Sequence, residues 1–110
     1  MELNKVAIVI SSYNQLELLE KCLESLKITA YENFEVFVVD DGGKGEIGKA
    51  IKEKFSEIDI TINNRNLGFS KANNVGMRKA LMSNPDYILL LNDDTEIIDP
   101  YWLNKMVQEG

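Results

Sequence analysis

The stretch Val6-Ala-Ile-Val-Ile-Ser-Ser-Tyr-Asn14 begins with five consecutive apolar residues and ends in residues that are polar or aromatic. Apolar residues at successive positions put hydrophobic side chains on both faces of a β-strand, which is typical of a buried strand in a parallel sheet. Three further short apolar runs follow, at residues 36–39, 58–62 and 88–91. Stretches with helical periodicity separate the runs, and this alternation predicts an α/β domain with a parallel sheet.

The four runs differ in how deeply they should be buried. The run Tyr87-Ile-Leu-Leu-Leu91 is apolar throughout, so we expect both faces of this strand to be covered, as for the first strand. Ile58, Ile60 and Ile62 alternate with polar residues. We therefore expect the third strand to lie at an edge of the sheet.

Helices are expected between the strands and after the last one. Asn14, followed three residues later by Glu17, predicts the start of the first helix in the manner of a capping box. Asp99 as N-cap and Pro100 as first helical residue predict the start of the fourth. The apolar positions that define the other expected helix faces are Leu16, Leu19, Leu23 and Leu26, then Ile47, Ile51 and Phe55, then residues from about 70 to 82.

The composition of the chain limits which side chains can take part in binding or catalysis. The chain has 110 residues, the length of a single domain. Its 12 basic and 18 acidic residues give a net charge of -6, which argues against a nucleic-acid partner bound through bulk positive charge. There is no histidine, so the usual general base and the commonest transition-metal ligand are absent. Chemistry must therefore rest on carboxylates, amides, hydroxyls and a bound metal.

Cysteine content and hydropathy bear on the compartment. Cys22 is the single cysteine, so no internal disulfide can form, which suits a reducing environment. No apolar run approaches the roughly 18 residues of a membrane span, and the N-terminus lacks the features of a signal peptide. We expect a cytoplasmic chain without a transmembrane segment, and peripheral contact with the inner face of the membrane stays open.

Polar clusters follow all four expected strands. In a parallel sheet these clusters emerge along one edge, and open α/β sheets bind ligands in the crevice outside the carboxyl ends of their strands. One crevice is therefore expected to collect acidic residues, amides and hydroxyls. The clusters are Ser11 to Asn14, Asp40 to Gly43, Asn63 to Asn66, and Asn92 to Thr95.

The distribution of charge favours a metal-bound phosphate ester in that crevice. Adjacent carboxylates such as Asp93 and Asp94 repel each other unless a cation is near, and Mg²⁺ or Mn²⁺ typically binds one or two carboxylates plus phosphate oxygens. Residues 60–85 contain four basic residues and no acid, whereas residues 86–99 contain five acids and no base. The alternative, that the pairs Asp93-Asp94 and Asp40-Asp41 only solvate turns, stays open here.

The third expected helix contains residues with low helix propensity. Asn73 and Asn74 inside a helix cost stability, and Gly76 adds to that cost. Either the amides contact a ligand or the helix packs very closely on the sheet. Tyr13 has a similar pair of interpretations, because a lone aromatic at a strand end either stacks on a base or packs on the core.

Taken together, these segments resemble family 2 glycosyltransferases, whose nucleotide-sugar-binding fold is called GT-A. The motifs occur in the family's order and spacing and span nearly the whole chain: VAIVISSYN, FEVFVVDDGG, NNRNLGFSKANNVGMRKAL and YILLLNDDTEI. Their spacing is most similar to the rhamnosyltransferase-like branch. The resemblance implies a Rossmann-like, mostly parallel sheet of order 3-2-1-4 with helices on both faces.

The resemblance also implies roles for individual residues. Asp40 would accept a hydrogen bond from the ring N–H of uracil or thymine. Asp93 would face the ribose, and Asp94, with Asp93, would bind Mn²⁺ or Mg²⁺ at the position of the family's DxD motif, where Asn92 takes the first place. The remaining residues implied to bind the nucleotide-sugar are Ser12, Tyr13, Asn66, Gly68, Phe69 and Asn73.

The implied activity is transfer of a sugar from a UDP- or dTDP-sugar to an acceptor hydroxyl, on a saccharide or lipid-linked saccharide in polysaccharide biosynthesis. The metal would stabilise the departing nucleoside diphosphate. Family members are commonly more than twice this long, so we expect residues 1–110 to form a single, truncated donor-binding domain. No residue can be assigned as the general base, and full activity is expected to need a missing C-terminal half.

Two alternatives remain. The first is a non-catalytic interaction domain with the same fold, which would associate with a separate polypeptide or with itself through the truncated face. The second is a Mg²⁺-dependent phosphohydrolase, since Asn92-Asp93-Asp94-Thr95 is similar to the DxDxT pattern of haloacid-dehalogenase-like enzymes. The second is disfavoured because the nucleophile would fall on Asn92, which cannot form an aspartyl phosphate.

Overall fold

A four-stranded parallel sheet forms the centre of the molecule, in a computed structural model that describes residues 3–109. The strand order is β3-β2-β1-β4, and every ladder between neighbours is parallel. The predicted sheet and its order are therefore confirmed. The strands are β1 (Val6–Ser12), β2 (Phe34–Asp40), β3 (Asp59–Ile62) and β4 (Tyr87–Asn92).

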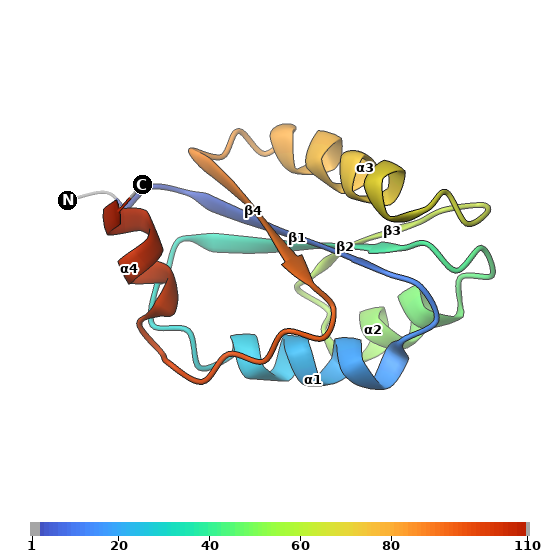
Figure 1. Cartoon of the computed structure of the whole chain (residues 1–110), viewed down its shortest axis with the longest axis horizontal. Coiled ribbons are helices and arrows are strands. Elements are labelled where there is room, and N and C mark those ends of the chain that lie inside the picture. The colour runs from blue at the N-terminus through green and yellow to red at the C-terminus, as the bar shows by residue number, and fades with distance from the viewer. Residues whose placement is uncertain (1–2, 110) are drawn as a thin grey trace.

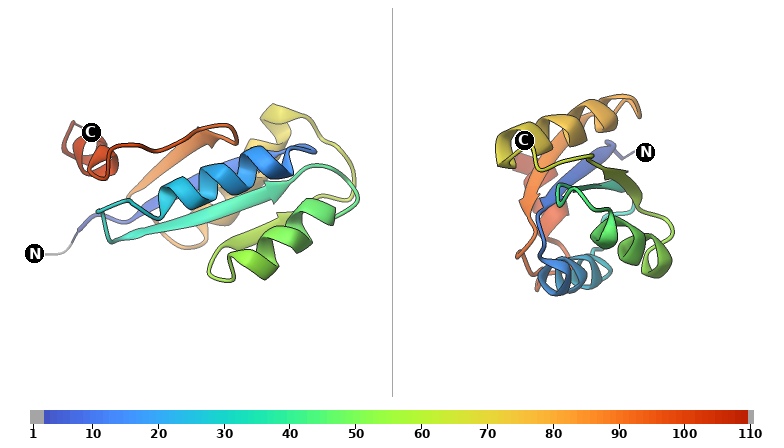
Figure 2. Two further views of the ribbon diagram at one scale, coloured as in Figure 1. Left: turned by 90° about the horizontal axis from the view of Figure 1, so that it is seen from below. Right: turned by 90° about the vertical axis from the view of Figure 1, so that its right-hand side faces the viewer.

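Helices cover both faces of this sheet, as Figures 1 and 2 show. Two of them pack on one face and enclose the larger apolar cluster, while the third packs on the opposite face over β1 and β2. The fourth lies at the end of the sheet where β1 and β4 begin. The helices are α1 (Leu16–Leu26), α2 (Glu46–Lys54), α3 (Phe69–Leu81) and α4 (Trp102–Glu109).

The register of the strands brings their carboxyl ends together. Ser12 of β1 pairs with Asp40 of β2, and Ser11 pairs with Asn92 of β4. Asp40 in turn pairs with Ile62 of β3. Every polar cluster that follows a strand therefore starts at nearly the same level, as expected for the predicted crevice.

The first helix begins later than the capping pattern predicts. Gln15, not Asn14, is the residue before the helix, and no side chain caps it by a hydrogen bond. Asn14 has a φ of 53°, in the left-handed region that Asn tolerates better than most residues. Its backbone conformation therefore belongs to the turn after β1, which ends the strand and reverses the chain into α1.

The fourth helix also begins after its predicted start. The Asp99 carboxylate accepts a hydrogen bond from Tyr101 N at 2.9 Å, but the chain forms a turn through Pro100 and Tyr101 before regular helix starts at Trp102. Asp99 thus makes the predicted kind of capping contact, but the contact stabilises a turn, and the helix begins after that turn.

Close approach to the sheet explains the glycine in the third helix. A Cβ on Gly76 would lie 2.5 Å from Val9 Cγ1 and 3.0 Å from Val39 Cγ2. Only a residue without a side chain lets α3 sit this close to β1 and β2. Close packing is thus confirmed as one reason for the poor helix propensity of this segment.

The prediction that β4 is covered on both faces is wrong. Leu90 is 46% exposed and Tyr87 is also exposed, in contrast to the fully buried β1. The physical reason is that β4 lies at an edge of the sheet and α3 packs mainly on β1 and β2. β3 is the other edge strand, as predicted.

No helix within residues 3–109 combines the length and the apolar character needed to cross a membrane.

Candidate functional site

A crevice of about 440 Å³ opens at the carboxyl ends of the strands. Its lining comes from the end of β1 and the turn after it, the residue after β2, the loop that leads into α3, and the residue after β4. It is the place where the parallel topology concentrates polar side chains. The lining residues are Ser11, Ser12, Tyr13, Gln15, Asp41, Asn66, Gly68, Phe69 and Asp93.

The crevice brings together most of the residues predicted for it. Six predicted residues line it, namely Ser12, Tyr13, Asn66, Gly68, Phe69 and Asp93. Four others do not, namely Asp40, Asn73, Asn92 and Asp94. The lining residues absent from the prediction are Ser11, Gln15 and Asp41. Asp41 is the most consequential of these, and the sequence signal for it was the acid pair that it forms with Asp40.

Asp40 serves the fold beside the crevice. Its side chain is 1% exposed, and its two oxygens accept hydrogen bonds from Gly42 N at 3.0 Å and Gly48 N at 2.8 Å. Gly48 is in the first turn of α2, where backbone N–H groups lack partners within the helix. The Asp40 carboxylate therefore caps α2 from the end of the neighbouring strand.

Asp41 organises the loop that leads into α3. Its Oδ1 accepts from Asn63 Nδ2 at 2.8 Å and from Leu67 N at 2.9 Å, and its Oδ2 accepts from Gly68 N at 3.0 Å. A carboxylate offers about four acceptor positions, two on each oxygen. Oδ1 is therefore filled, and Oδ2 keeps one acceptor position in a residue that lines the crevice.

The conformation of the same loop depends on a glycine and on a hydrogen bond to the backbone of Asp41. Gly68 has a φ of 92°, in a region open to glycine, and it precedes α3 directly. Asn66 Nδ2 donates to the Asp41 backbone oxygen at 3.1 Å, so the loop is tied down at both ends. The crevice wall on this side is a preorganised structure.

Asp93 forms the opposite wall of the crevice, and Asp94 follows it in the chain outside the lining. Ser12 Oγ donates to Asp93 Oδ2 at 2.9 Å, which orients that carboxylate across the carboxyl end of β1. Within the described part of the chain, no Lys or Arg pairs with either acid, and Asp94 is exposed. The pair has the donor set that a hard divalent cation takes.

The described residues would supply only part of a metal's coordination sphere. Among residues 3–109 no group of three or more His, Cys, Asp or Glu side chains is arranged to hold a metal ion. Two carboxylates with otherwise open coordination positions fit Mg²⁺ or Mn²⁺ whose other ligands are water and phosphate oxygens. The chemistry of the residues therefore fits a metal that arrives with a phosphate ligand.

The negative charge of this acid pair affects the nearby thiol of Cys22. This buried thiol lies next to the carboxyl end of β4, with Sγ 3.9 Å from Asn92 O. Burial, and then the negative charges of Asp93 and Asp94, raise the pKa of the thiol to about 11. The thiol is accordingly a neutral packing group at physiological pH.

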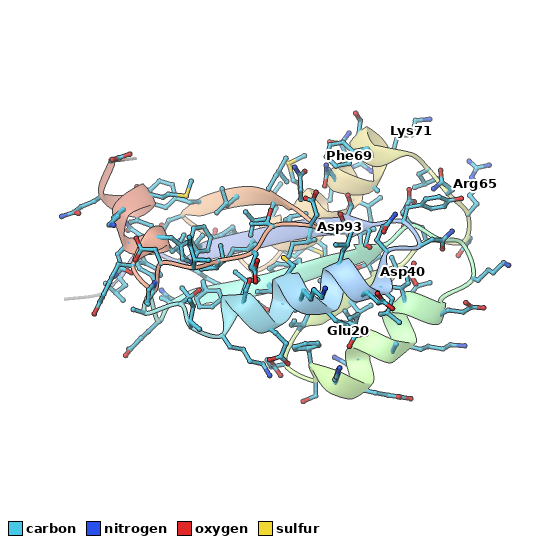
Figure 3. All side chains as sticks on the ribbon, turned by 60° about the horizontal axis from the view of Figure 1, so that its bottom comes forward. Glu20, Asp40, Arg65, Phe69, Lys71 and Asp93 are labelled. Carbon is cyan, nitrogen blue, oxygen red and sulfur yellow. The ribbon has the colours of Figure 1, made fainter. Side chains whose placement is uncertain are left out.

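Aromatic and basic side chains surround the crevice. Tyr13 and Phe69 both line it and are 53% and 65% exposed, so neither is held in the core. Figure 3 shows Phe69 at the start of α3, with Arg65 and Lys71 extending outward nearby. Exposed aromatic faces suit stacking with a planar ring, and the two cations lie on the side away from Asp93.

Asn73 lies on the sheet-facing side of α3 with Ala72 and Gly76. It is buried, and its Oδ1 has no hydrogen-bond partner in the structure. Asn74 is exposed. A buried acceptor without a partner lowers stability, so burial on the sheet does not explain the choice of Asn at position 73.

Comparison with known proteins gives a consistent picture. The profile described as Glycosyl transferase family 2 matches residues 7–109. The chain is 35% identical over 101 residues to the glycosyltransferase GlyA of Streptococcus pneumoniae, covering 89% of this chain and 14% of the relative. It is 31% identical over 107 residues to the uncharacterized glycosyltransferase YwdF of Bacillus subtilis, covering 96% and 38%. The chain thus spans well under half the length of these curated relatives.

Solved structures share the fold. The mannosyltransferase PcManGT from Pyrobaculum calidifontis, in complex with GDP-Man and Mn²⁺, matches with a TM-score of 0.80 at 20% identity, covering 98% of this chain and 32% of that one. S. aureus TarS 1-349, in complex with UDP-GlcNAc, matches with a TM-score of 0.76 at 21% identity, covering 94% and 30%. These likenesses confirm the GT-A-like fold expected from the sequence.

Proposed function

The chain belongs to glycosyl transferase family 2, and from this premise we propose that its crevice binds the nucleotide of a UDP- or dTDP-sugar. Asp94 and Asp93 would hold a Mn²⁺ or Mg²⁺ ion, which would neutralise negative charge on the diphosphate. The sugar would pass to a hydroxyl group of an acceptor. The support comes from the polar crevice, its aromatic rim and its uncompensated acid pair.

The observation that carries the proposal is the open acceptor position on Asp41 Oδ2. This oxygen accepts one hydrogen bond, from Gly68 N, and Asp41 lines the crevice together with Tyr13 and Phe69. Uracil and thymine each present one ring N–H between two carbonyl groups, which one acceptor position matches. Cytosine has no hydrogen on that nitrogen, and guanine presents two adjacent donors that suit a carboxylate with both oxygens open.

Asp41 thereby takes the role that the resemblance assigned to Asp40. Both oxygens of Asp40 accept backbone N–H groups, and the residue lies outside the crevice lining. Breaking those bonds to bind a base would leave buried donors without partners. We therefore propose that Asp40 supports the site through α2 and that Asp41 reads the base.

The proposed metal would supply Lewis-acid stabilisation of the departing diphosphate. Ser12 would keep Asp93 oriented, through its 2.9 Å hydrogen bond, while Asp94 remains free to bind the cation. PcManGT was solved with GDP-Man and Mn²⁺, and TarS with UDP-GlcNAc, which supports a nucleotide-sugar ligand of this class. The base differs between these two proteins, so the choice of base rests on Asp41.

Acceptor binding and the transfer of the sugar are proposed for a longer protein of this type. The chain spans 14% of GlyA and 38% of YwdF, so most of each relative lies outside the matched region. We propose the donor half of the reaction for this chain and no residue as general base. The likeness to the rhamnosyltransferase-like branch, the saccharide or lipid-linked acceptor and a cytoplasmic location stay predictions.

Calorimetric titration of the purified chain tests the proposal. UDP, dTDP, CDP and GDP are each titrated with Mn²⁺ present and with the metal removed by EDTA. UDP and dTDP should bind, CDP and GDP should bind at least about tenfold more weakly, and EDTA should weaken UDP binding by a similar factor. Absence of binding by UDP and dTDP would refute the proposed function, and equal binding of all four would refute base selection by Asp41.

A further inference from the structure

The segment that contains the second acid pair lies against α1. β4 ends at Asn92, and the chain then runs along α1 toward α4, as Figure 1 shows. Thr95 N donates to Asn92 O at 3.1 Å, which closes a β-turn with Asp93 and Asp94 at its two central positions. The backbone of this turn therefore sets the directions in which the two carboxylates leave the chain.

Two successive turns of α1 contact the two ends of this segment. Cys22 lies beside its start, with Sγ 3.9 Å from Asn92 O. One turn further along α1, Ser25 Oγ accepts a hydrogen bond from Ile97 N at 2.9 Å. Among the described residues this is the first hydrogen bond after the acid pair that joins the chain to another element. Residues 93–96 therefore form a short loop that the same helix contacts at both ends.

The hydroxyl group of Ser25 is itself fixed in direction. Ser25 Oγ donates to Cys22 O, in the preceding turn of α1, at 2.7 Å. Because its hydrogen is used in that bond, Oγ presents only lone pairs to the loop, and these accept from Ile97 N. The Ile97 side chain is partly buried against the larger apolar cluster, which restricts the same residue from the other side.

A second set of hydrogen bonds holds the chain further from the acid pair. Trp102 Nε1 donates to Thr29 Oγ1 at 3.0 Å, and Ala30 N donates to Pro100 O at 2.8 Å. These bonds join the residues that follow α1 to the start of α4. They are of the same kind as the Ser25 bond but act on a different part of the chain, so they supply a matched comparison.

We propose that Ser25 is a positioning residue for the divalent cation, because its bond to Ile97 N fixes the loop that presents Asp93 and Asp94. The inference rests on the proposed function for the place of the ion. Ser12 orients the Asp93 side chain from β1, and Ser25 fixes the backbone on the other side of the pair.

The physical basis of this role is preorganisation of an exposed carboxylate. Asp94 is exposed and has no ion-pair partner among residues 3–109, so the backbone of the loop is what restricts its position. A loop that is ordered before the ion binds does not have to be ordered by the ion, and the affinity for the ion is higher for that reason. Groups that hold the ligands of a metal in place influence its affinity through this effect.

Amide hydrogen exchange in the metal-free chain tests the positioning itself. Ser25→Ala removes the acceptor, and the Ile97 amide should then exchange at least about tenfold faster than in the wild-type chain. Ser25→Thr keeps the hydroxyl group and should keep the slow exchange, since Ser25 borders an open hollow of about 600 Å³ with room for a methyl group. Thr29→Val removes the partner of Trp102 Nε1 and should leave exchange at Ile97 unchanged.

The affinity for manganese is then measured on the same four proteins. Mn²⁺ alone is titrated, and the paramagnetic broadening of the NMR signals of residues 92–97 gives the affinity. Ser25→Ala should bind Mn²⁺ at least about tenfold more weakly, whereas Ser25→Thr and Thr29→Val should match the wild type. Calorimetry with UDP should show a smaller effect of Mn²⁺ in Ser25→Ala and an unchanged affinity in EDTA, which a general loss of structure would not produce.

Several outcomes would overturn the proposal. Wild-type affinity for Mn²⁺ in folded Ser25→Ala would do so, and so would an equal loss in Thr29→Val. Fast exchange of the Ile97 amide in the wild-type chain would overturn it without any variant. Absence of broadening at residues 92–97 in the wild type would refute the metal site and this role together. Failure of UDP to bind, with broadening and slow exchange retained, would refute the proposed function alone.

Discussion

The two acid pairs of this chain look alike in sequence and differ in every physical respect in the structure. Asp40-Asp41 follows the apolar run of β2, and Asp93-Asp94 follows that of β4. The first pair is 1% and 3% exposed, and its carboxylates accept five hydrogen bonds. Among residues 3–109 the second pair accepts one, from Ser12, and Asp94 is open to solvent.

The position of each strand in the sheet explains the difference. β2 lies between β1 and β3, so the loop after β3 and the start of α2 converge on its carboxyl end and surround Asp40 and Asp41 with donors. β4 lies at an edge of the sheet, and among the described residues the donor to its acid pair is Ser12 at the end of β1. The acid pair on the inner strand thus accepts hydrogen bonds that hold the fold together, whereas the described residues provide no ion-pair partner for the pair on the edge strand.

The largest expected effect is on folding, at Asp40. Asp40→Ala leaves the N–H groups of Gly42 and Gly48 without partners and should lower the free energy of unfolding by about 3 kcal/mol. Urea unfolding followed by circular dichroism measures this loss. The matched control is Asp94→Ala, which should change stability by less than about 0.5 kcal/mol. Equal losses in the two variants would contradict the contrast between the pairs.

Asp41→Asn should cost about 2 kcal/mol of stability, because an Asn side chain has one acceptor oxygen for the three donors that now meet two carboxylate oxygens. The same variant should also lose its preference for UDP over CDP in calorimetry. Urea unfolding measures the loss of stability by itself. Calorimetry, carried out without urea where the variant is folded, then measures the change in base preference. Retained preference for UDP would show that Asp41 serves the fold alone.

The next effect is on binding and not on folding. Asp94→Ala should weaken UDP binding in the presence of Mn²⁺ by at least about tenfold, which equals about 1.4 kcal/mol, while the urea midpoint stays unchanged. The physical reason is that the Asp94 side chain is exposed and forms no contact on which the fold depends. Titration with UDP and Mn²⁺ measures the effect, and wild-type affinity in the variant would refute the metal assignment.

The smallest effect is a loss of stability at alkaline pH. Burial and the charges of Asp93 and Asp94 hold the pKa of Cys22 at about 11, compared with an ordinary value of 9.0. The unfolded chain therefore loses this proton first, so the stability from the neutral thiol is complete below pH 9 and is lost as pH rises through 11. Between about pH 8 and 9.5 the loss should be below about 1 kcal/mol.

Urea midpoints measured across this pH range test that expectation. Cys22→Ala should be less stable at every pH because it leaves a small cavity, but its stability should not fall with pH through the thiol. A fall of equal slope in both proteins would show that another group is responsible. Adding Asp93→Asn should reduce the slope of the parent, since the charge of Asp93 is one of the causes of the raised pKa.

Much of the site was predictable because it depends on chain order. The apolar runs predict where the parallel strands end, and the family resemblance implies their order in the sheet. The predicted residues that line the crevice follow these strand ends: Ser12, Tyr13, Asn66, Gly68, Phe69 and Asp93. Asp40 and Asp41 could not be told apart in this way. They are adjacent, and successive side chains in extended chain point to opposite sides, so which acid faces the crevice depends on which side holds α2.

The sequence by itself determined the four strands, their parallel arrangement and the edge at which polar residues collect, because apolar periodicity and turn residues are local properties of the chain. The order of the strands followed from the resemblance to the family. The tertiary structure alone decided that Asp40 caps α2, that Asp41 keeps an acceptor position in the crevice, and that β4 is open to solvent. Each of these depends on hydrogen bonds or packing between segments distant along the chain. Such contacts leave no pattern in the local order of residues.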